Sequence, residues 1–461
     1  MSSNKVVFTS NNVLLPGNES CKPATVIADK TTGKIVEVRE SRSSRSDFPE
    51  ANDNEWIDAG DKSILPGLVD SHVHLNEPGR TDWEGFWTGT QAAVAGGVTT
   101  VVDMPLNSIP PTTTKENLAI KRKAAKGQCW SDVAFWGGLI PGNEHELRAM
   151  SEDGVKGFKC FMIESGVEEF PCVKAENIEK AMQELQNTDT VLLFHAELES
   201  EKVHAEARPG TDPHLYETYL DSRPEELECD AINLIISLQK KYPSVRCHIV
   251  HLSAASALPS IRAARKAGAR LTVETCFHYL VLASSSIPDA APQYKCCPPI
   301  RDEANRNALW EALVDGTIDC VVSDHSPCVA ELKRLQDGDL MKAWGGISTL
   351  GLGLSLLWTE GKKRGVSIGQ IMKWTSEATS KQASLQDKKG AIRVGWDADL
   401  IIWDPEAQFK ITKENLHFKN KLSAYVGITV QGKVEKTFVG GQLAWNASVN
   451  GGGPQPIGHL I

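Results

Sequence analysis

Two histidines, His72 and His74, stand one residue apart at the end of the apolar stretch 64–73. Side chains alternate between the two faces of a strand, so these imidazoles would point the same way. Two converging imidazoles suit a divalent metal ion. An isolated pair of this kind is more often found on an exposed edge strand, but the stretch before it is too apolar for such an edge. The choice between these explanations depends on which other polar groups the chain brings to the same place.

Other apolar segments also carry a polar residue at or near their ends. Taken alone, each has an ordinary explanation: a histidine can be a hydrogen-bonded core residue, a lysine can reach solvent, and an aspartate can cap a helix. A lysine within an apolar segment is unusual, however, because burying an ammonium group without a partner is costly. With His72 and His74 included, six such groups at the ends of five segments are too many for coincidence. The four further residues are Lys159, His195, His251 and Asp324.

Such a set could hold two divalent metal ions and activate water. Four imidazoles, one carboxylate and a bridging anion provide enough ligands for two zinc ions, which keep an open coordination position in catalytic sites. Two metals about 3.5–4 Å apart share a hydroxide whose pKa is lowered towards neutrality. An ammonium group is not a metal ligand. A buried lysine with a depressed pKa can nevertheless react with CO₂ to give a carbamate, which would supply the bridging anion.

Residues 64–385 alternate between strand-like and helix-like segments, which indicates an α/β fold with parallel strands joined by crossover helices. Eight such units that close on themselves form a (β/α)8 TIM barrel, in which catalytic residues lie at the carboxyl ends of strands. The alternative, an open doubly wound sheet, would be favoured by a glycine-rich phosphate loop after the first strand, and none follows Val69. The predicted strands are 67–72, 98–104, 133–140, 157–162, 190–195, 246–252, 270–276 and 319–323.

Both ends of the chain have β character instead. Strand-like segments occupy 5–9, 24–29 and 34–38 near the N-terminus, and 399–403, 425–430, 433–439 and 442–445 near the C-terminus, where Gln431-Gly432 and Gly440-Gly441 are predicted turns. The simplest interpretation is that residues 1–63 and 386–447 meet as one small β-sandwich domain, with the barrel of residues 64–385 inserted between its halves. The glycine-rich residues 448–461 are expected to be a flexible tail.

The composition is that of an ordinary globular protein. The chain has 461 residues, of which 41% are hydrophobic and 23% charged, and a net charge of −10 without a basic block, so we expect no nucleic-acid partner and no attachment to a membrane. No apolar run approaches the roughly 18 residues of a membrane span. The 11 cysteines include no CxxC pair and the N-terminus lacks a signal-peptide pattern, so we expect reduced thiols and a cytoplasmic location.

The set of HxH, strand-end lysine, two further histidines and aspartate resembles the amidohydrolase superfamily, in its cyclic-amide branch of dihydroorotases, hydantoinases or dihydropyrimidinases, and allantoinases. The resemblance covers nearly the whole chain. It implies that His72, His74 and Asp324, with Lys159 carbamylated to N6-carboxylysine, hold one of two zinc ions (or other divalent metals) per subunit. Asp324 would also be the catalytic base, which takes a proton from the hydroxide and passes it to the leaving nitrogen. The second ion would be held by Lys159, His195 and His251.

Neighbouring residues distinguish members of this branch. Dihydroorotases carry an arginine two positions after the second histidine, where this chain has Asn76, so a strong bidentate contact with a substrate carboxylate would be missing. Hydantoinases carry a tyrosine five residues beyond the strand lysine, where this chain has Glu164. The runs HVHLNEPGRTDWEGF, DMPLNS, GFKCFM, HAE and SDHSPC resemble those of allantoinases. The resemblance therefore implies allantoin as the small-molecule substrate, with its hydantoin ring opened to give allantoate.

Weaker signals concern substrate contacts. Asn107 could donate to a ring carbonyl, although it is as well explained as a turn residue before Pro110. Cys297 matches a hydantoinase serine whose main chain holds the ring, and Gly345 and Gly346 match a main-chain contact opposite it. Main-chain donors and acceptors suit a flat ring rich in N–H and C=O groups.

The resemblance also implies a homo-oligomer, namely a homotetramer. Two other functions compete with that of an allantoinase. One is a hydantoinase or dihydropyrimidinase. The other is a non-catalytic, dihydropyrimidinase-like scaffold; such relatives lose metal ligands, whereas all six positions are intact here.

Overall fold

The middle of the chain forms the predicted barrel in a computed structural model, which describes residues 4–201 and 203–461. Its strands pair in parallel in two runs, β6-β7-β8 and β9-β10-β11-β12-β13-β14. A bridge between Val73 and His325 joins the first and last strands and closes the ring. The strands are β6 (Leu68–Val73), β7 (Val98–Asp103), β8 (Asp132–Phe135), β9 (Gly137–Gly138), β10 (Gly157–Phe161), β11 (Val191–His195), β12 (Arg246–Ile249), β13 (Leu271–Cys276) and β14 (Cys320–Val322).

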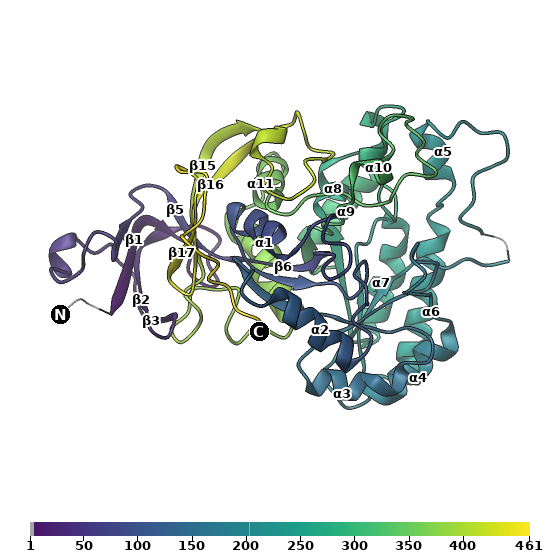
Figure 1. Cartoon of the computed structure of the whole chain (residues 1–461), viewed down its shortest axis with the longest axis horizontal. Helices are drawn as coiled ribbons and strands as arrows, with labels where there is room; N and C mark the ends of the chain where they lie inside the picture. The colour runs from purple at the N-terminus through teal and green to yellow at the C-terminus, as the bar shows by residue number, and fades with distance from the viewer. Residues whose placement is uncertain (1–3, 202) are drawn as a thin grey trace.

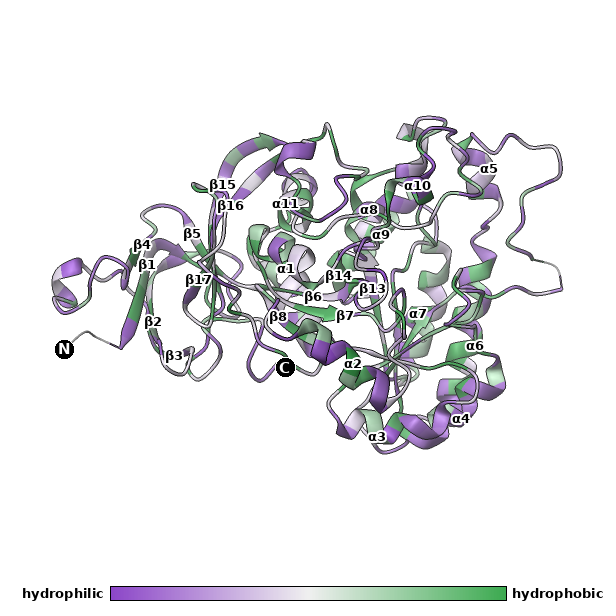
Figure 2. Cartoon of the chain, viewed as in Figure 1, coloured by the Kyte–Doolittle hydropathy of each residue, from purple (hydrophilic) through white to green (hydrophobic). Residues whose placement is uncertain are grey.

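Helices surround the barrel and bury one face against it (Figure 1). In α4, for example, Ile178, Ala181, Met182 and Leu185 are buried, which is the spacing of one helix face. Figure 2 shows hydrophilic residues on the outward side of this helix and apolar residues in barrel strands such as β7. In the described part of the chain, no helix is both long and apolar enough to cross a bilayer. The helices are α1 (Phe86–Ala95), α2 (Lys115–Ala125), α3 (Leu147–Glu152), α4 (Ala175–Leu185), α5 (Tyr216–Asp221), α6 (Glu226–Lys241), α7 (Leu258–Lys266), α8 (Phe277–Val281), α9 (Glu303–Val314), α10 (Ala330–Lys333), α11 (Gly353–Lys362), α12 (Ile368–Met372) and α13 (Ala378–Gln382).

The two ends of the chain meet in one sheet, as predicted. Its order is β17-β16-β15-β5-β1-β2-β3, with β4 beside β1, and the antiparallel pair β5 and β15 joins the two ends. Purple N-terminal and yellow C-terminal strands accordingly lie together in Figure 1. The sheet curls over on itself as a sandwich. The evidence is that Phe8 in β1 and Phe438 in β16 pack edge to face at 4.9 Å, although β15 and β5 separate these strands in the sheet. Residues 1–3 of the predicted domain lie outside the described residues. The strands are β1 (Lys5–Val13), β2 (Lys22–Asp29), β3 (Lys34–Arg39), β4 (Trp56–Asp58), β5 (Ser63–Pro66), β15 (Leu400–Lys410), β16 (Thr429–Val439) and β17 (Gln442–Asn446).

One predicted turn in this domain is wrong. Residues 424–427 form turns instead of a strand, and Gln431-Gly432 lies inside β16. Gly432 has a φ of 87°, and the pairing of β16 with β15 shifts register at this point, so the glycine belongs to a bulge. A Cβ there would lie 2.7 Å from Trp403. The glycine does mark irregular backbone, but the irregularity is a bulge within a strand.

The expected flexible tail instead packs against the barrel. The Val133 N–H donates to His459 O at 2.8 Å, and the Ile461 N–H donates to Val133 O at 2.9 Å. The Gly458 N–H also donates to Cys129 O at 2.9 Å. β8 is an edge of its three-stranded run and has unpaired main-chain groups, which the tail satisfies. Glycine content therefore did not predict mobility here, because the tail meets an open strand edge.

Candidate active site

The six predicted metal-binding side chains line one cavity of about 280 Å³ at the carboxyl ends of the barrel strands. None of them is more than 6% exposed. In a barrel this end is where side chains from different strands converge. The residues are His72 in β6 and His74 just after it, Lys159 in β10, His195 at the end of β11, and His251 and Asp324 two positions beyond β12 and β14.

Two of these histidines converge on the aspartate. His72 Nε2 lies 3.1 Å from Asp324 Oδ1, and His74 Nε2 lies 3.5 Å from the same oxygen. One donor atom of each of the three residues lies within 4.8 Å of the others. Nitrogen and oxygen donors at this spacing fit zinc or another divalent ion.

The other two histidines leave a ring nitrogen free. The rings of His195 and His251 pack edge to face at 4.6 Å. The Nδ1 atom of each is buried and has no hydrogen-bond partner among the described residues. Burial lowers the pKa of both imidazoles, which favours the neutral form that binds metals. An unpaired buried nitrogen is costly, which distinguishes these two rings from ordinary hydrogen-bonded core histidines.

Unusual backbone places two of these residues. His251 has a φ of 38° and Asp324 a φ of 41°, both in the left-handed region that side chains other than glycine rarely adopt. Each lies just past a strand, where the chain turns over the rim. Such conformations cost about 1–3 kcal/mol and cluster at functional sites.

A buried glutamate that the sequence analysis did not identify orients His72. Glu274 lies in β13, and its Oε1 is 2.5 Å from His72 Nδ1 while its Oε2 is 3.0 Å from His248 Nε2. Burial alone would raise the pKa of Glu274, but the charge of His72 and the hydrogen bonds of His248 and His72 lower it to about 2. The contact of this carboxylate with Nδ1 fixes the orientation of the ring, so Nε2 of His72 is directed at Asp324 in the cavity. His248 is therefore a hydrogen-bonded core residue.

A second glutamate plays the same part for His195. Glu197 Oε2 lies 2.7 Å from His195 Nε2 and accepts a hydrogen bond from Arg223 at 2.5 Å. Burial would raise the pKa of Glu197, but Arg223 and His195 lower it to about 2. The contact leaves His195 Nδ1 directed away from the glutamate. Both glutamates show a signal that sequence can provide, namely an acid in or just after an apolar strand.

Lys159 is the most isolated charge in the cavity. It is 1% exposed, and its Nζ forms no hydrogen bond or ion pair within the described chain. Its Nζ lies 5.3 Å from the centre of the Phe161 ring. Burial lowers the pKa of Lys159 to about 8, although the charges of Glu274 and Asp324 oppose the shift. A sizeable neutral fraction at mild pH makes the amine nucleophilic.

The predicted substrate contacts are placed unequally. Asn107, Cys297 and Gly345 line the cavity, whereas Gly346 does not; Asn76, which replaces the dihydroorotase arginine, does not line it either. Asn107 has a φ of 61°, its Nδ2 lies 3.3 Å from His74 Nδ1, and its buried Oδ1 has no partner among the described residues, so it is both a turn residue and a lining residue. The side chain of Asn76 is buried near Pro327.

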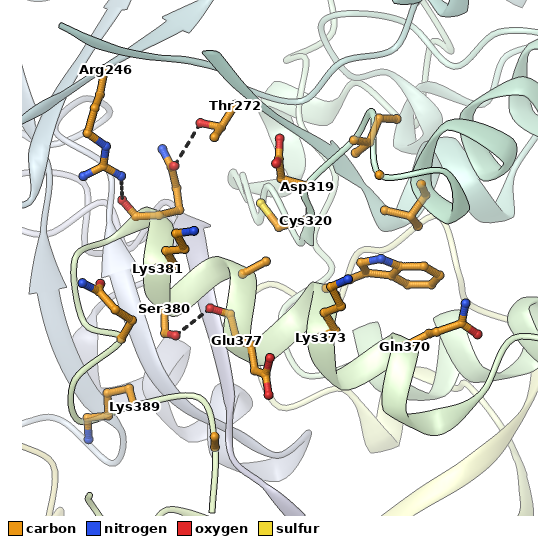
Figure 3. A pocket seen from close by; sticks show the side chains of 18 of the residues that line it. Arg246, Thr272, Asp319, Cys320, Gln370, Lys373, Glu377, Ser380, Lys381 and Lys389 are labelled. Atoms are coloured by element: carbon orange, nitrogen blue, oxygen red, sulfur yellow. Dashed lines mark hydrogen bonds between the residues drawn. The ribbon is translucent and has the colours of Figure 1, made fainter. Parts of the chain in front are cut away.

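A larger cavity of about 1020 Å³ opens at the opposite, amino-terminal ends of β12, β13 and β14. Figure 3 shows Arg246, Thr272 and Asp319 on one side of it and Lys373 and Lys381 on the other. None of the described residues that line it is a histidine. The larger cavity is therefore not the candidate active site, because the predicted metal-binding residues line the smaller one.

Comparisons with known proteins agree with this geometry. A family model described as the amidohydrolase family matches residues 63–444. The chain is 48% identical over 459 residues to the allantoinase of Saccharomyces cerevisiae, with 98% of each chain covered. It is 54% identical over 347 residues to the mitochondrial allantoinase of Aquarana catesbeiana, covering 75% of this chain and 70% of that one. The solved L-hydantoinase (dihydropyrimidinase) from Arthrobacter aurescens matches with a TM-score of 0.89 at 28% identity, covering 98% of this chain and 99% of that chain.

Proposed function

We propose that this chain, which belongs to the amidohydrolase family, is an allantoinase that hydrolyses an amide bond in the hydantoin ring of allantoin to give allantoate. The observation that carries the proposal is the cavity in which four histidines, a lysine and an aspartate converge. Similarity to allantoinases over 98–100% of the chain, at 48% and 44% identity, favours this substrate over hydantoin or dihydrouracil. The intact ligand set argues against a non-catalytic scaffold.

We infer that the same cavity holds a pair of divalent metal ions. His72, His74 and Asp324 would hold one ion and His195 and His251 the other, with Lys159 between them as its carbamate. The free Nδ1 atoms of His195 and His251 support this assignment. Bound there, zinc or another divalent ion would lower the pKa of water and polarise the substrate carbonyl.

The chain's own groups would then handle the proton. Burial would raise the pKa of Asp324, but His72 and His74 hold it well below its usual value, so the carboxylate is ionised and can accept a proton. Its Oδ1 is already directed at the histidine nitrogens. We assign Asp324 as the base that takes a proton from the attacking water and returns it to the leaving ring nitrogen. Main-chain groups at Cys297 and Gly345, with Asn107, would hold the flat ring.

A substrate comparison tests the function directly. We expect purified protein to open allantoin with a larger kcat/KM than hydantoin, dihydrouracil or dihydroorotate, measured by product formation under identical metal loading. Asp324→Asn is the matched control for contaminating activity. A larger kcat/KM for dihydrouracil would reassign the enzyme as a dihydropyrimidinase. Absence of turnover on all four rings, with about two equivalents of bound metal, would remove the hydrolase proposal.

We also propose a homotetramer in the cytoplasm. All 11 cysteines are free, which supports a reducing compartment. Light scattering during gel filtration would give the mass of four chains if the assembly is right. Because one relative is named as mitochondrial, imaging of the tagged chain in its own cell tests the compartment.

A further inference from the structure

Two main-chain segments meet beside the candidate metal site. One contains Lys295 and Cys297 and the other contains Trp344 and Gly345, and all four residues line the cavity. A Cβ on Gly345 would lie 2.7 Å from Cys297 Sγ, so the segments are in direct contact. The Gly346 N–H donates to Lys295 O at 2.9 Å. These are the segments whose main chain would hold the substrate ring.

A second buried ammonium group joins the two segments, in addition to Lys295 Nζ, which donates to Met341 O at 2.9 Å and to Ala343 O at 2.8 Å. Lys333, the last residue of α10, is 5% exposed. Its Nζ donates to Trp344 O at 2.8 Å, to Gly346 O at 2.5 Å and to Lys295 O at 3.3 Å. A lysine ammonium has three N–H donors, so Lys333 uses all of them on main-chain carbonyls of these segments.

Lys333 has no acidic partner in the described chain. The charged and titratable groups that face it are Lys295 and the thiols of Cys296, Cys297 and Cys328, and burial lowers its pKa to about 8. Burying an ammonium group without a carboxylate is costly, and an apolar side chain could fill the same space. Stability alone therefore does not explain a lysine here. Its three contacts with main-chain carbonyls explain the lysine, because they hold the two segments beside the cavity at a fixed distance.

We propose that Lys333 is a positioning residue for substrate binding, because its ammonium group sets the spacing between segments 295–297 and 344–346. This inference rests on the proposed function for the identity of the substrate. Lys333 does not itself line the cavity and is not a catalytic residue. It acts through the main chain that it holds.

The expected consequence is a loss of binding without a loss of chemistry. Without the ammonium group, the carbonyls of Trp344 and Gly346 would lose this donor and Lys295 O would keep the Gly346 N–H, so the two segments would be held less firmly and could move relative to each other. Main-chain hydrogen bonds to the ring would then be misaligned. The six candidate metal ligands belong to other segments, so metal loading and the chemical step should persist.

The test compares two buried lysines. Lys333→Met should raise KM for allantoin about tenfold, as expected for one or two misaligned hydrogen bonds, and change kcat less than about threefold. Metal content, measured by mass spectrometry, should match the wild type. Lys389→Met is the control, since Lys389 is equally buried but lies among three carboxylates away from the cavity; it should leave KM unchanged.

An unchanged KM in Lys333→Met would overturn the inference, as would an equal rise in Lys389→Met. If the methionine variant does not fold, Lys333→Gln carries the same test, because it keeps the position polar but cannot span all three carbonyls. Failure of the proposed function is distinguishable. In that case the wild type would not open allantoin, and the same KM comparison would use whichever cyclic amide it does open.

Discussion

The two ends of the barrel each bury a lysine, and the two lysines have opposite surroundings. Lys159, at the carboxyl end, is 1% exposed and has no acidic partner in the described chain. Lys389, at the amino-terminal end, is 2% exposed and lies 2.5 Å from Asp132, 2.9 Å from Asp397 and 2.7 Å from Asp399.

This difference shows which lysine is structural. Burial would lower the pKa of Lys389, but its three aspartates raise it well above the usual value, so it stays an ammonium ion. It links the start of β8 to the strand that begins the C-terminal half of the β domain. Burial lowers the pKa of Lys159 to about 8, because the more distant charges of Glu274 and Asp324 offset only part of its effect. A buried lysine left without a partner is the one available for chemistry.

Replacing the unpaired lysine should have the largest effect. Lys159→Ala removes the proposed bridging carbamate, so we expect metal content to fall and hydrolysis to reach the background rate. Short-chain carboxylates should partly restore both by supplying a bridging anion. Elemental analysis and an allantoin assay with and without propionate measure this. Full metal binding in the variant without rescue would contradict the carbamate.

Replacing the proposed base should leave more of the site intact. Asp324→Asn keeps the shape of the side chain but cannot accept the proton, so kcat should fall about 10²–10⁴-fold. At least one metal should remain, because His72, His74, His195 and His251 are unchanged. A wild-type kcat with normal metal content would refute the role of Asp324.

The sequence predicted those parts of the site that depend on local pattern. An apolar run that ends in His195 or contains Lys159 shows both the strand and the rim of the barrel. Glu274 also lies in an apolar strand, but only the structure shows that it contacts His72, which is 202 residues away in the sequence.

Other features depend on packing between segments distant in sequence. Lys333 lies in a charged stretch of sequence that predicts an exposed segment. It is buried because the segments beside the cavity cover it. The C-terminal tail is ordered because β8 has an open edge, and Gly432 lies in a bulge because of its pairing with β15. No local pattern reports such contacts.

The depressed pKa of Lys159 predicts how the metal-free protein regains activity. Only the neutral amine reacts with CO₂, and its fraction rises with pH, from about 1% at pH 6 to about half at pH 8 for a pKa near 8. At a fixed concentration of dissolved CO₂, reactivation by zinc should therefore be about fiftyfold faster at pH 8 than at pH 6. Stopped samples assayed for allantoin hydrolysis give the rate. A reactivation rate that does not depend on the CO₂ concentration would show that carbamylation of Lys159 is not part of the activation step.

Replacing the paired lysine should have the smallest effect on catalysis and a clear effect on folding. Lys389→Met leaves the buried Asp132 and Asp399 without the ammonium group they share, while the partly exposed Asp397 keeps Lys34, and this should lower the free energy of unfolding by about 3–5 kcal/mol. Urea denaturation measures this loss, and kcat/KM for allantoin under native conditions should stay within about twofold of the wild type, because the six cavity residues lie at the other end of the barrel. The triple variant in which all three aspartates become asparagine should tolerate Lys389→Met better than the wild-type background does, since the uncompensated charge is then absent. If Lys389→Met instead lowered kcat without lowering the free energy of unfolding, the assignment of a structural role to Lys389 and a chemical role to Lys159 would be wrong.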